Sequence, residues 1–316
     1  MPPSRSKASV VLVGADVGAS RTRVAVDGGD GAPRVIEAAG ASPSVLGARA
    51  AGERLVRILE EAMDDFVPRA IILGVAGAWR ASVARLLEEM VARRFPGARV
   101  EVTHDARIAL RAVHPVGDGL VVLAGTGMIA YGESGGRSYR SGGYGHLIGD
   151  EGSGFSLGAA ALRAAAQAYD GVRPRDELAT AVARATGAED LHALLAFAYE
   201  RGDDAVTRVA ALAPTVIALA DRGDRGATQL VQKAAAALAG AALAVARASG
   251  LHERETTVVL AGGLLERNSL LTYLLETRLQ NELPLATVIK NSLPAWLGAL
   301  SLARTSARAD CVIEKE

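Results

Sequence analysis

Two glycine-rich turns in this sequence contain residue types that suit a phosphate site. The first reads Asp16-Val17-Gly18-Ala19-Ser20-Arg21-Thr22 after an apolar run, and the second reads Gly125-Thr126-Gly127. Glycines at strand ends let backbone amides approach a phosphate closely, and Ser20 and Thr22 add hydroxyl groups. Each turn alone is also typical of a tight hairpin. The repetition favours two turns that grip one polyphosphate, with Asp16 holding Mg²⁺ through water.

A second acid, Asp105, is a candidate catalytic group. It stands in Thr103-His104-Asp105-Ala106, where a predicted strand ends and a helix begins. Carboxyl ends of strands in α/β sheets face the ligand crevice, so this carboxylate could accept the proton of an attacking hydroxyl. A helix N-cap is an equally good interpretation of its position.

The segment 141–154 is the strongest single indication of a ligand-binding site in the sequence. It carries six glycines in fourteen residues, together with Tyr144, His146, Asp150 and Glu151. A flexible linker would be rich in Ser and Gly without a paired Asp-Glu, so the pattern favours a ligand loop with an aromatic ring and a fixed carboxylate. Ser153 could cap the helix that follows. No cysteine cluster accompanies His146, so we expect no zinc site there.

A third glycine break, Ala261-Gly262-Gly263, ends the apolar run 257–260. A diglycine lets a flat base or a ribose lie against the backbone, although in isolation it is best explained as a turn between a strand and a helix.

Composition limits the class of protein. The chain has 316 residues, 35 basic and 35 acidic side chains, and one cysteine, Cys311. A balanced charge argues against a general nucleic-acid binder, and one cysteine cannot form an internal disulfide or an iron–sulfur site. The polar N-terminus lacks a signal-peptide core, and the apolar stretch 234–246 is shorter than a membrane span needs. We therefore expect a cytoplasmic protein with no membrane partner.

The hydrophobic patterns predict an α/β fold that occurs twice along the chain. The order βββαβαβα occurs in both halves, and in the second half extra helices form one insertion after the third strand. We predict an N-terminal domain of residues 1–112 plus 295–316 and a C-terminal domain of residues 113–294, with a nucleotide in the cleft between them.

Together these segments resemble the superfamily of actin, hexokinase and heat-shock chaperone ATPases. The nearest branch is the BadF/BadG-type ATPases, in particular the N-acetylglucosamine kinases and archaeal broad-specificity hexokinases, with Gly149–Gly154 as the most specific match. The resemblance implies two ribonuclease H-like domains, ATP and Mg²⁺ as cofactors, and transfer of phosphate to a hexose or hexosamine. We also expect a homodimer.

The resemblance assigns roles residue by residue. It implies that Asp16 organises Mg²⁺ and that Asp105 binds the sugar hydroxyl and acts as base. The residues implied to contact ATP are Gly18, Ser20, Thr22, Gly125, Thr126, Gly127, Gly262, Gly263 and Asn268, and those implied to contact the sugar are Ser42, Asp105, Gly143, Tyr144, Gly145 and Asp150.

Three positions depart from the family pattern. Tyr144 stands where Trp is common, Met128 and Ile129 replace Ser-Asn, and an Asn expected near Ser42 is absent. These changes remove polar contacts to the sugar substituents and favour relaxed sugar specificity.

Other functions of this superfamily fit less well. A dehydratase activator needs cluster-binding cysteines, and a sugar-sensing regulator needs a DNA-binding module and a cysteine-rich zinc motif. A filament or chaperone ATPase would not need the segment 142–154.

Overall fold

The computed structural model describes residues 10–313, except residues 30, 65 and 200–204. The chain divides into two compact units. Met1–Val116 with Leu293–Glu316 form the first, and Gly117–Ser292 form the second. The sequence placed these divisions at 112/113 and 294/295, a few residues away.

The first unit is a five-stranded sheet in the order β3-β2-β1-β4-β5. β1 pairs antiparallel with β2 and parallel with β4, which pairs parallel with β5. Its elements are β1 (Val11–Val17), β2 (Arg21–Asp27), β3 (Arg34–Ala39), α1 (Pro43–Leu46), α2 (Ala48–Met63), β4 (Pro68–Val75), α3 (Ala81–Arg94), β5 (Arg99–Thr103), α4 (Asp105–Val113) and α12 (Trp296–Ile313).

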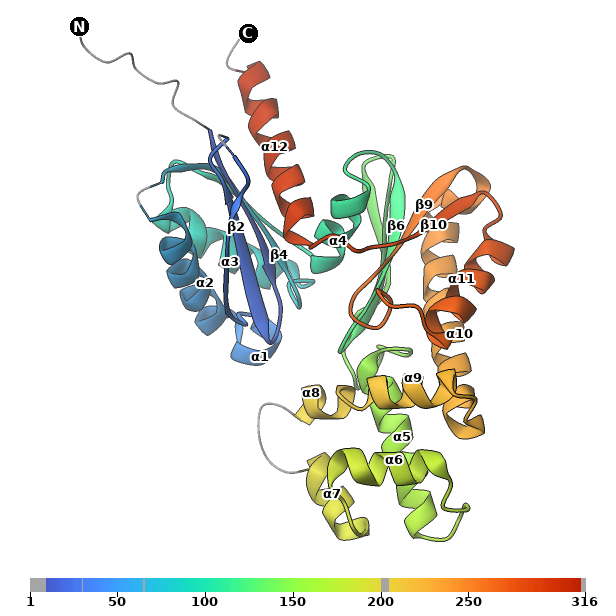
Figure 1. The fold of residues 1–316 in the computed structure, drawn as a ribbon. Coiled ribbons are helices and arrows are strands. Elements are labelled where there is room, and N and C mark those ends of the chain that lie inside the picture. The colour runs from blue at the N-terminus through green and yellow to red at the C-terminus, as the bar shows by residue number, and fades with distance from the viewer. Residues whose placement is uncertain (1–9, 30, 65, 200–204, 314–316) are drawn as a thin grey trace, which may run out of the picture. The chain divides into compact units, whose positions relative to one another are not determined.

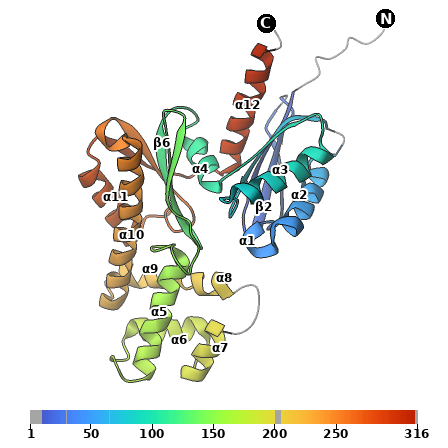
Figure 2. The same ribbon diagram turned by 180° about the vertical axis from the view of Figure 1, so that it is seen from behind.

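Alternating residues of this sheet face two different helical layers. Val13, Ala15 and Val17 pack with residues of α2 and α3, whereas Leu12 packs with Ile108 of α4 and with α12. Figures 1 and 2 show α2 and α3 on one side of the sheet and α4 and α12 on the other. Because both faces are covered, β4 is buried at every residue from Ala70 to Val75, as its unbroken apolar run predicted.

The second unit repeats the arrangement, with the sheet order β10-β9-β6-β7-β8. Its elements are β6 (Gly119–Ala124), β7 (Met128–Ser134), β8 (Arg137–Gly142), α5 (Gly154–Tyr169), α6 (Glu177–Thr186), α7 (Leu191–Tyr199), α8 (Ala205–Ala210), α9 (Ala213–Asp221), α10 (Arg225–Ser249), η1 (Leu251–Glu253), β9 (Thr256–Ala261), α11 (Leu270–Glu282) and β10 (Ala286–Lys290). The α/β class and its duplication are therefore confirmed.

The helical insertion differs from the sequence prediction in one place. A single helix over 203–222 was expected, but α8 ends at Ala210 and α9 begins at Ala213. Pro214 stands in the first turn of α9, where its missing amide costs nothing, and it could not continue a helix from α8.

α10 is longer than the apolar stretch suggested. It runs for 25 residues, and among the described residues it is the one helix whose length and composition would let it cross a bilayer. The apolar stretch 234–246 is thus only part of a longer helix. α10 nevertheless packs against β7, β8, α9 and α11, with Val231, Leu238 and Val245 buried, and we interpret it as a core helix of the second unit.

Candidate functional site

The first turn is a tight hairpin between β1 and β2. The amide of Gly18 donates to the carbonyl of Arg21 at 2.8 Å, and Ala19 and Ser20 are exposed. Gly40 closes against the turn so tightly that a Cβ there would lie 1.9 Å from the carbonyl oxygen of Ala19. The exposed amides at the tip are therefore held rigidly, as a phosphate-binding turn requires.

Two of the predicted side chains are inaccessible in this structure: the Thr22 hydroxyl is buried without a hydrogen-bond partner among the described residues, and the Ser42 hydroxyl is hydrogen-bonded within the first unit. Thr22 is fully buried, because it shares the β2 face of Val24, which packs toward α2 and α3. Ser42 is 2% exposed, donates to the carbonyl of Ala76 and accepts from the amide of Ser44 as the N-cap of α1. We therefore withdraw Thr22 as a phosphate contact and Ser42 as a sugar contact.

Asp16 and Asp105 form a pair of carboxylates in the first unit. Asp16 stands near the end of β1, and Asp105 is the first residue of α4, directly after β5. Burial raises the pKa of Asp16, although Arg23 and Arg21 oppose this. Burial, with the negative charge of Asp16 as the second cause, raises the pKa of Asp105 to about 6. The structure thus brings together two acids that lie 89 positions apart in the sequence.

The N-cap interpretation of Asp105 does not hold. His104 occupies the N-cap of α4, and its side chain makes no capping hydrogen bond to that helix. The Asp105 carboxylate accepts from the amide of Ala106 at 2.9 Å, so it stays close to the helix start.

The second turn is fixed by the start of α5. The amides of Gly154 and Phe155 donate to the carbonyls of Gly125 and Thr126, at 2.8 and 3.1 Å. These carbonyls are therefore directed at α5. Within the described part of the chain, the amides of Thr126 and Gly127 donate to no backbone carbonyl of the turn, which leaves them available for phosphate oxygens.

Asp150 ties the loop 142–154 to this turn. It has a left-handed backbone, with φ of 64°, and accepts from the amides of Met128 and Gly145. A Cβ at Gly127 would lie 2.9 Å from its Oδ2. Its Oδ1 is buried and has no partner among the described residues, and burial raises the pKa of the carboxyl. Such an atom can accept a ligand hydroxyl.

The loop presents apolar side chains to solvent. Tyr144 is 46% exposed, and the Arg140 guanidinium lies 5.1 Å from its ring centroid. The ring of His146 lies 4.8 Å from that of Phe155. Gly143 and Gly145 both have positive φ, so the turns on either side of Tyr144 favour glycine.

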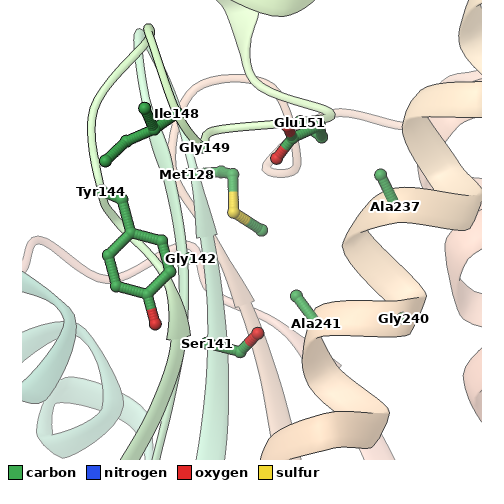
Figure 3. Close-up of a pocket in the computed structure, with 10 residues that line it drawn as sticks. All are labelled: Met128, Ser141, Gly142, Tyr144, Ile148, Gly149, Glu151, Ala237, Gly240 and Ala241. Carbon is green, nitrogen blue, oxygen red and sulfur yellow. The ribbon is translucent and has the colours of Figure 1, made fainter.

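A cavity of about 310 Å³ lies between this loop and α10. Figure 3 shows Tyr144 and Ile148 on one side and Ala237 and Ala241 of α10 on the other. The cavity lies on the Met128 face of the sheet, and Asp150 is not part of its lining. The remaining lining residues are Ser141, Gly142, Gly149, Glu151 and Gly240.

Gly262 and Gly263 follow β9 beside the second turn. Gly262 has φ of 92°, and a Cβ there would lie 2.4 Å from the carbonyl oxygen of Ala124, whereas one at Gly263 would meet nothing within 4 Å. Gly262 therefore permits close packing of β9 on β6, and Gly263 leaves an open backbone surface for a ligand.

Asn268 belongs to a polar network that the sequence did not predict. Its carboxamide oxygen accepts from Lys290 at the end of β10, and Lys290 also pairs with Glu276 at 3.2 Å. The parallel order of β9 and β10, which a single sequence does not reveal, brings Lys290 to this edge.

A model of the BadF/BadG/BcrA/BcrD ATPase family matches residues 13–303. The chain belongs to this ATPase family.

Two relatives match nearly the whole chain. An N-acetylmuramic acid/N-acetylglucosamine kinase from Clostridium acetobutylicum is 28% identical over 306 residues, which cover 93% of this chain and 98% of that protein. A crystal structure of a candidate N-acetylglucosamine kinase from Chromobacterium violaceum is 27% identical, with a TM-score of 0.73, and covers 93% of this chain and 99% of that one. An N-acetyl-D-glucosamine kinase from Dictyostelium discoideum is 29% identical over 243 residues, 76% of each protein.

A more distant structure supports the fold alone. The ROK family glucokinase from Streptomyces griseus is 18% identical, with a TM-score of 0.57 over 93% of this chain and 98% of that one. This ATPase fold therefore extends to sugar kinases that share little sequence with the chain.

The residues of the first unit fit Mg²⁺ chemistry. Among the described residues no group of three His, Cys, Asp or Glu side chains could hold a metal. Magnesium keeps most of its waters and needs only one or two carboxylates together with substrate phosphates. Asp16, a single carboxylate near the end of β1, matches that requirement better than it matches a closed metal centre.

Proposed function

We propose that this protein is an ATP-dependent sugar kinase that transfers the γ-phosphoryl group to a hydroxyl, the 6-OH, of hexoses and hexosamines. The observation that carries the proposal is the carboxylate pair Asp16 and Asp105, both half-buried, at strand ends of the first unit. The family and the kinase relatives support it. The activity would reside in the cytoplasm.

In the proposed reaction Asp105 acts as general base. Its carboxylate accepts the proton of the sugar hydroxyl while the hydroxyl oxygen bonds to the γ-phosphorus, and the bond to the β-γ bridging oxygen breaks to release ADP. Asp16 would hold Mg²⁺ through water, and bound Mg²⁺ supplies charge neutralisation on the phosphate oxygens.

Backbone groups bind the rest of the donor in this proposal. The amides at the tips of the two turns, Ala19-Ser20 and Thr126-Gly127, would donate to phosphate oxygens, and Gly18 and Gly125 shape those turns. Gly263 and Asn268 would lie against the adenosine. For the acceptor, Tyr144 would pack against the sugar, and Asp150 would accept a sugar hydroxyl through Oδ1.

Relaxed sugar choice is the first testable consequence. Met128 and Ile129 are buried apolar side chains, and neither can hydrogen-bond an N-acetyl group. An apolar wall discriminates between analogues by only about 1–3 kcal/mol. We therefore expect glucose, mannose, glucosamine and N-acetylglucosamine to be phosphorylated, with kcat/KM values within roughly two decades.

The measurement is ADP release with ATP and Mg²⁺ over a panel of these sugars, with water as the background acceptor. One sugar preferred by many decades would disprove relaxed choice but leave the kinase intact. ATP hydrolysis that no sugar stimulates would disprove the kinase and favour another ATPase role of the family.

The pH profile is the second consequence. A general base must be deprotonated, and the pKa of Asp105 is raised to about 6. We expect kcat/KM for the sugar to fall as the pH drops below about 6. Because the charge of Asp16 is one cause of this rise, Asp16→Asn should move the acid limb to lower pH in whatever activity remains. An acid limb near pH 4, or one that Asp16→Asn leaves in place, would contradict the assignment.

A further inference from the structure

Ile108 of α4 lies between two glycines from different elements. It stands one helical turn after Asp105, is fully buried, and packs in the core between the sheet of the first unit and α12. Gly74 of β4 lies against its side chain, and Gly298 of α12 lies against its backbone.

The contact with Gly74 leaves no room for a methyl group. A Cβ at Gly74 would lie 2.2 Å from Cδ1, 2.4 Å from Cγ1 and 2.9 Å from Cγ2 of Ile108. Rotation of the terminal methyl alone cannot relieve three such overlaps, because a β-branched side chain in a helix keeps one χ1 rotamer. The surrounding core is closed, so the helix itself would have to move.

The contact with Gly298 is with the main chain of α4. A Cβ at Gly298 would lie 1.8 Å from the carbonyl oxygen of Ile108 and 2.6 Å from the amide nitrogen of Ala112. Backbone atoms of a helix cannot rotate away, so this overlap too would displace α4 as a body.

Gly74 also lies at the level of the sheet where Asp16 stands and from which Asp105 follows. It pairs in register with Asp16 on β1 and with Thr103 on β5, two residues before Asp105. The closeness of α4 to this level of the sheet therefore sets the distance between Asp105 and Asp16.

We infer that Gly74 and Gly298 are positioning residues, which clamp Ile108 from two sides and so hold the Asp105 carboxylate in place beside Asp16. This inference rests on the proposed function insofar as Asp105 is taken as the base. A misplacement of about 1 Å can cost about 10²-fold in rate, so the clamp should have a large effect on catalysis.

The test is a set of variants measured for kcat, for the KM of sugar and of ATP, and for thermal unfolding. Gly74→Ala should lower kcat/KM for the sugar by about 10²-fold, with the KM of ATP unchanged. Adding Ile108→Ala removes all three overlapping atoms and should restore most of the activity. Gly298→Ala should cause a similar loss that Ile108→Ala does not restore, because its overlap is with backbone.

Gly52→Ala is the matched control. Gly52 lies in α2 on the other face of the same sheet, and a Cβ there would meet the flexible end of Met90, 2.4 Å from Sδ. It should retain wild-type kinetics. If Gly74→Ala yields no folded protein, the volume-conserving Ile108→Leu, which moves the branch point toward Gly74, should show the same loss for the sugar with the KM of ATP unchanged.

Three results would overturn the clamp. They are full activity in a folded Gly74→Ala, equal rescue of both glycine variants by Ile108→Ala, and an equal loss in Gly52→Ala. If the wild-type protein shows no sugar-dependent ADP release, the proposed function fails separately. A crystal structure of Gly74→Ala then decides the clamp, because an Asp105 unmoved relative to Asp16 would disprove it.

Discussion

Asp105→Asn is expected to lower kcat by about 10²–10⁴-fold and at the same time to stabilise the fold. The loss follows because an amide cannot accept the proton of the sugar hydroxyl. ATP binding should survive, since Asp105 is proposed to contact only the acceptor. Steady-state kinetics and ATP titration measure both effects.

The gain in stability follows from the raised pKa. A carboxyl whose pKa rises from 3.8 to about 6 on folding favours the folded state below pH 3.8 and loses this contribution as the pH rises through 6. At pH 7 the buried charge therefore costs about 3 kcal/mol, at about 1.4 kcal/mol for each pH unit. An uncharged Asn avoids that cost, and thermal unfolding at pH 7 should show a higher Tm.

Asp27→Asn is the matched control, for which we expect the opposite change in Tm. A hydrogen bond from Arg304 lowers the pKa of Asp27, so its carboxylate stabilises the fold at pH values above its unfolded pKa and loses this effect as the pH falls. Its loss should lower the Tm at pH 7 and leave kcat unchanged. Near-native kcat in Asp105→Asn would remove Asp105 from the chemistry, and a lower Tm would show that its charge stabilises the fold.

Asp16→Ala is expected to raise the Mg²⁺ concentration for half-maximal activity by about 10–100-fold, the range found when a group that holds a metal ligand is removed. The reason is that Asp16 would hold the ion through its waters. A Mg²⁺ titration at saturating ATP and sugar measures the shift, with Asp27→Asn again as control.

This variant should also lower kcat at saturating Mg²⁺, because the carboxylate that orients the ion is gone. An unchanged Mg²⁺ dependence would remove Asp16 from the metal site. It would then leave Asp16 only its electrostatic effect on Asp105.

The sequence by itself determined the duplication and the local turns. Short-range patterns of apolar residues, glycines and caps predict the order βββαβαβα of helices and strands along the chain. They also predict the hairpin at Gly18, the cap at Ser153 and the helix that begins at Asp105. Such features depend on neighbours within a few residues, so they can be read without the fold.

The tertiary structure decided which side chains are free to act. Thr22 and Ser42 have suitable hydroxyls, but strand alternation buries Thr22, and hydrogen bonds with Ala76 and Ser44 occupy the Ser42 hydroxyl. The closeness of Asp16 to Asp105 likewise depends on the order in which β1, β4 and β5 pair, together with the packing of α4 at Gly74. Sheet order and helix packing join residues far apart in the chain, and no local pattern encodes those distances.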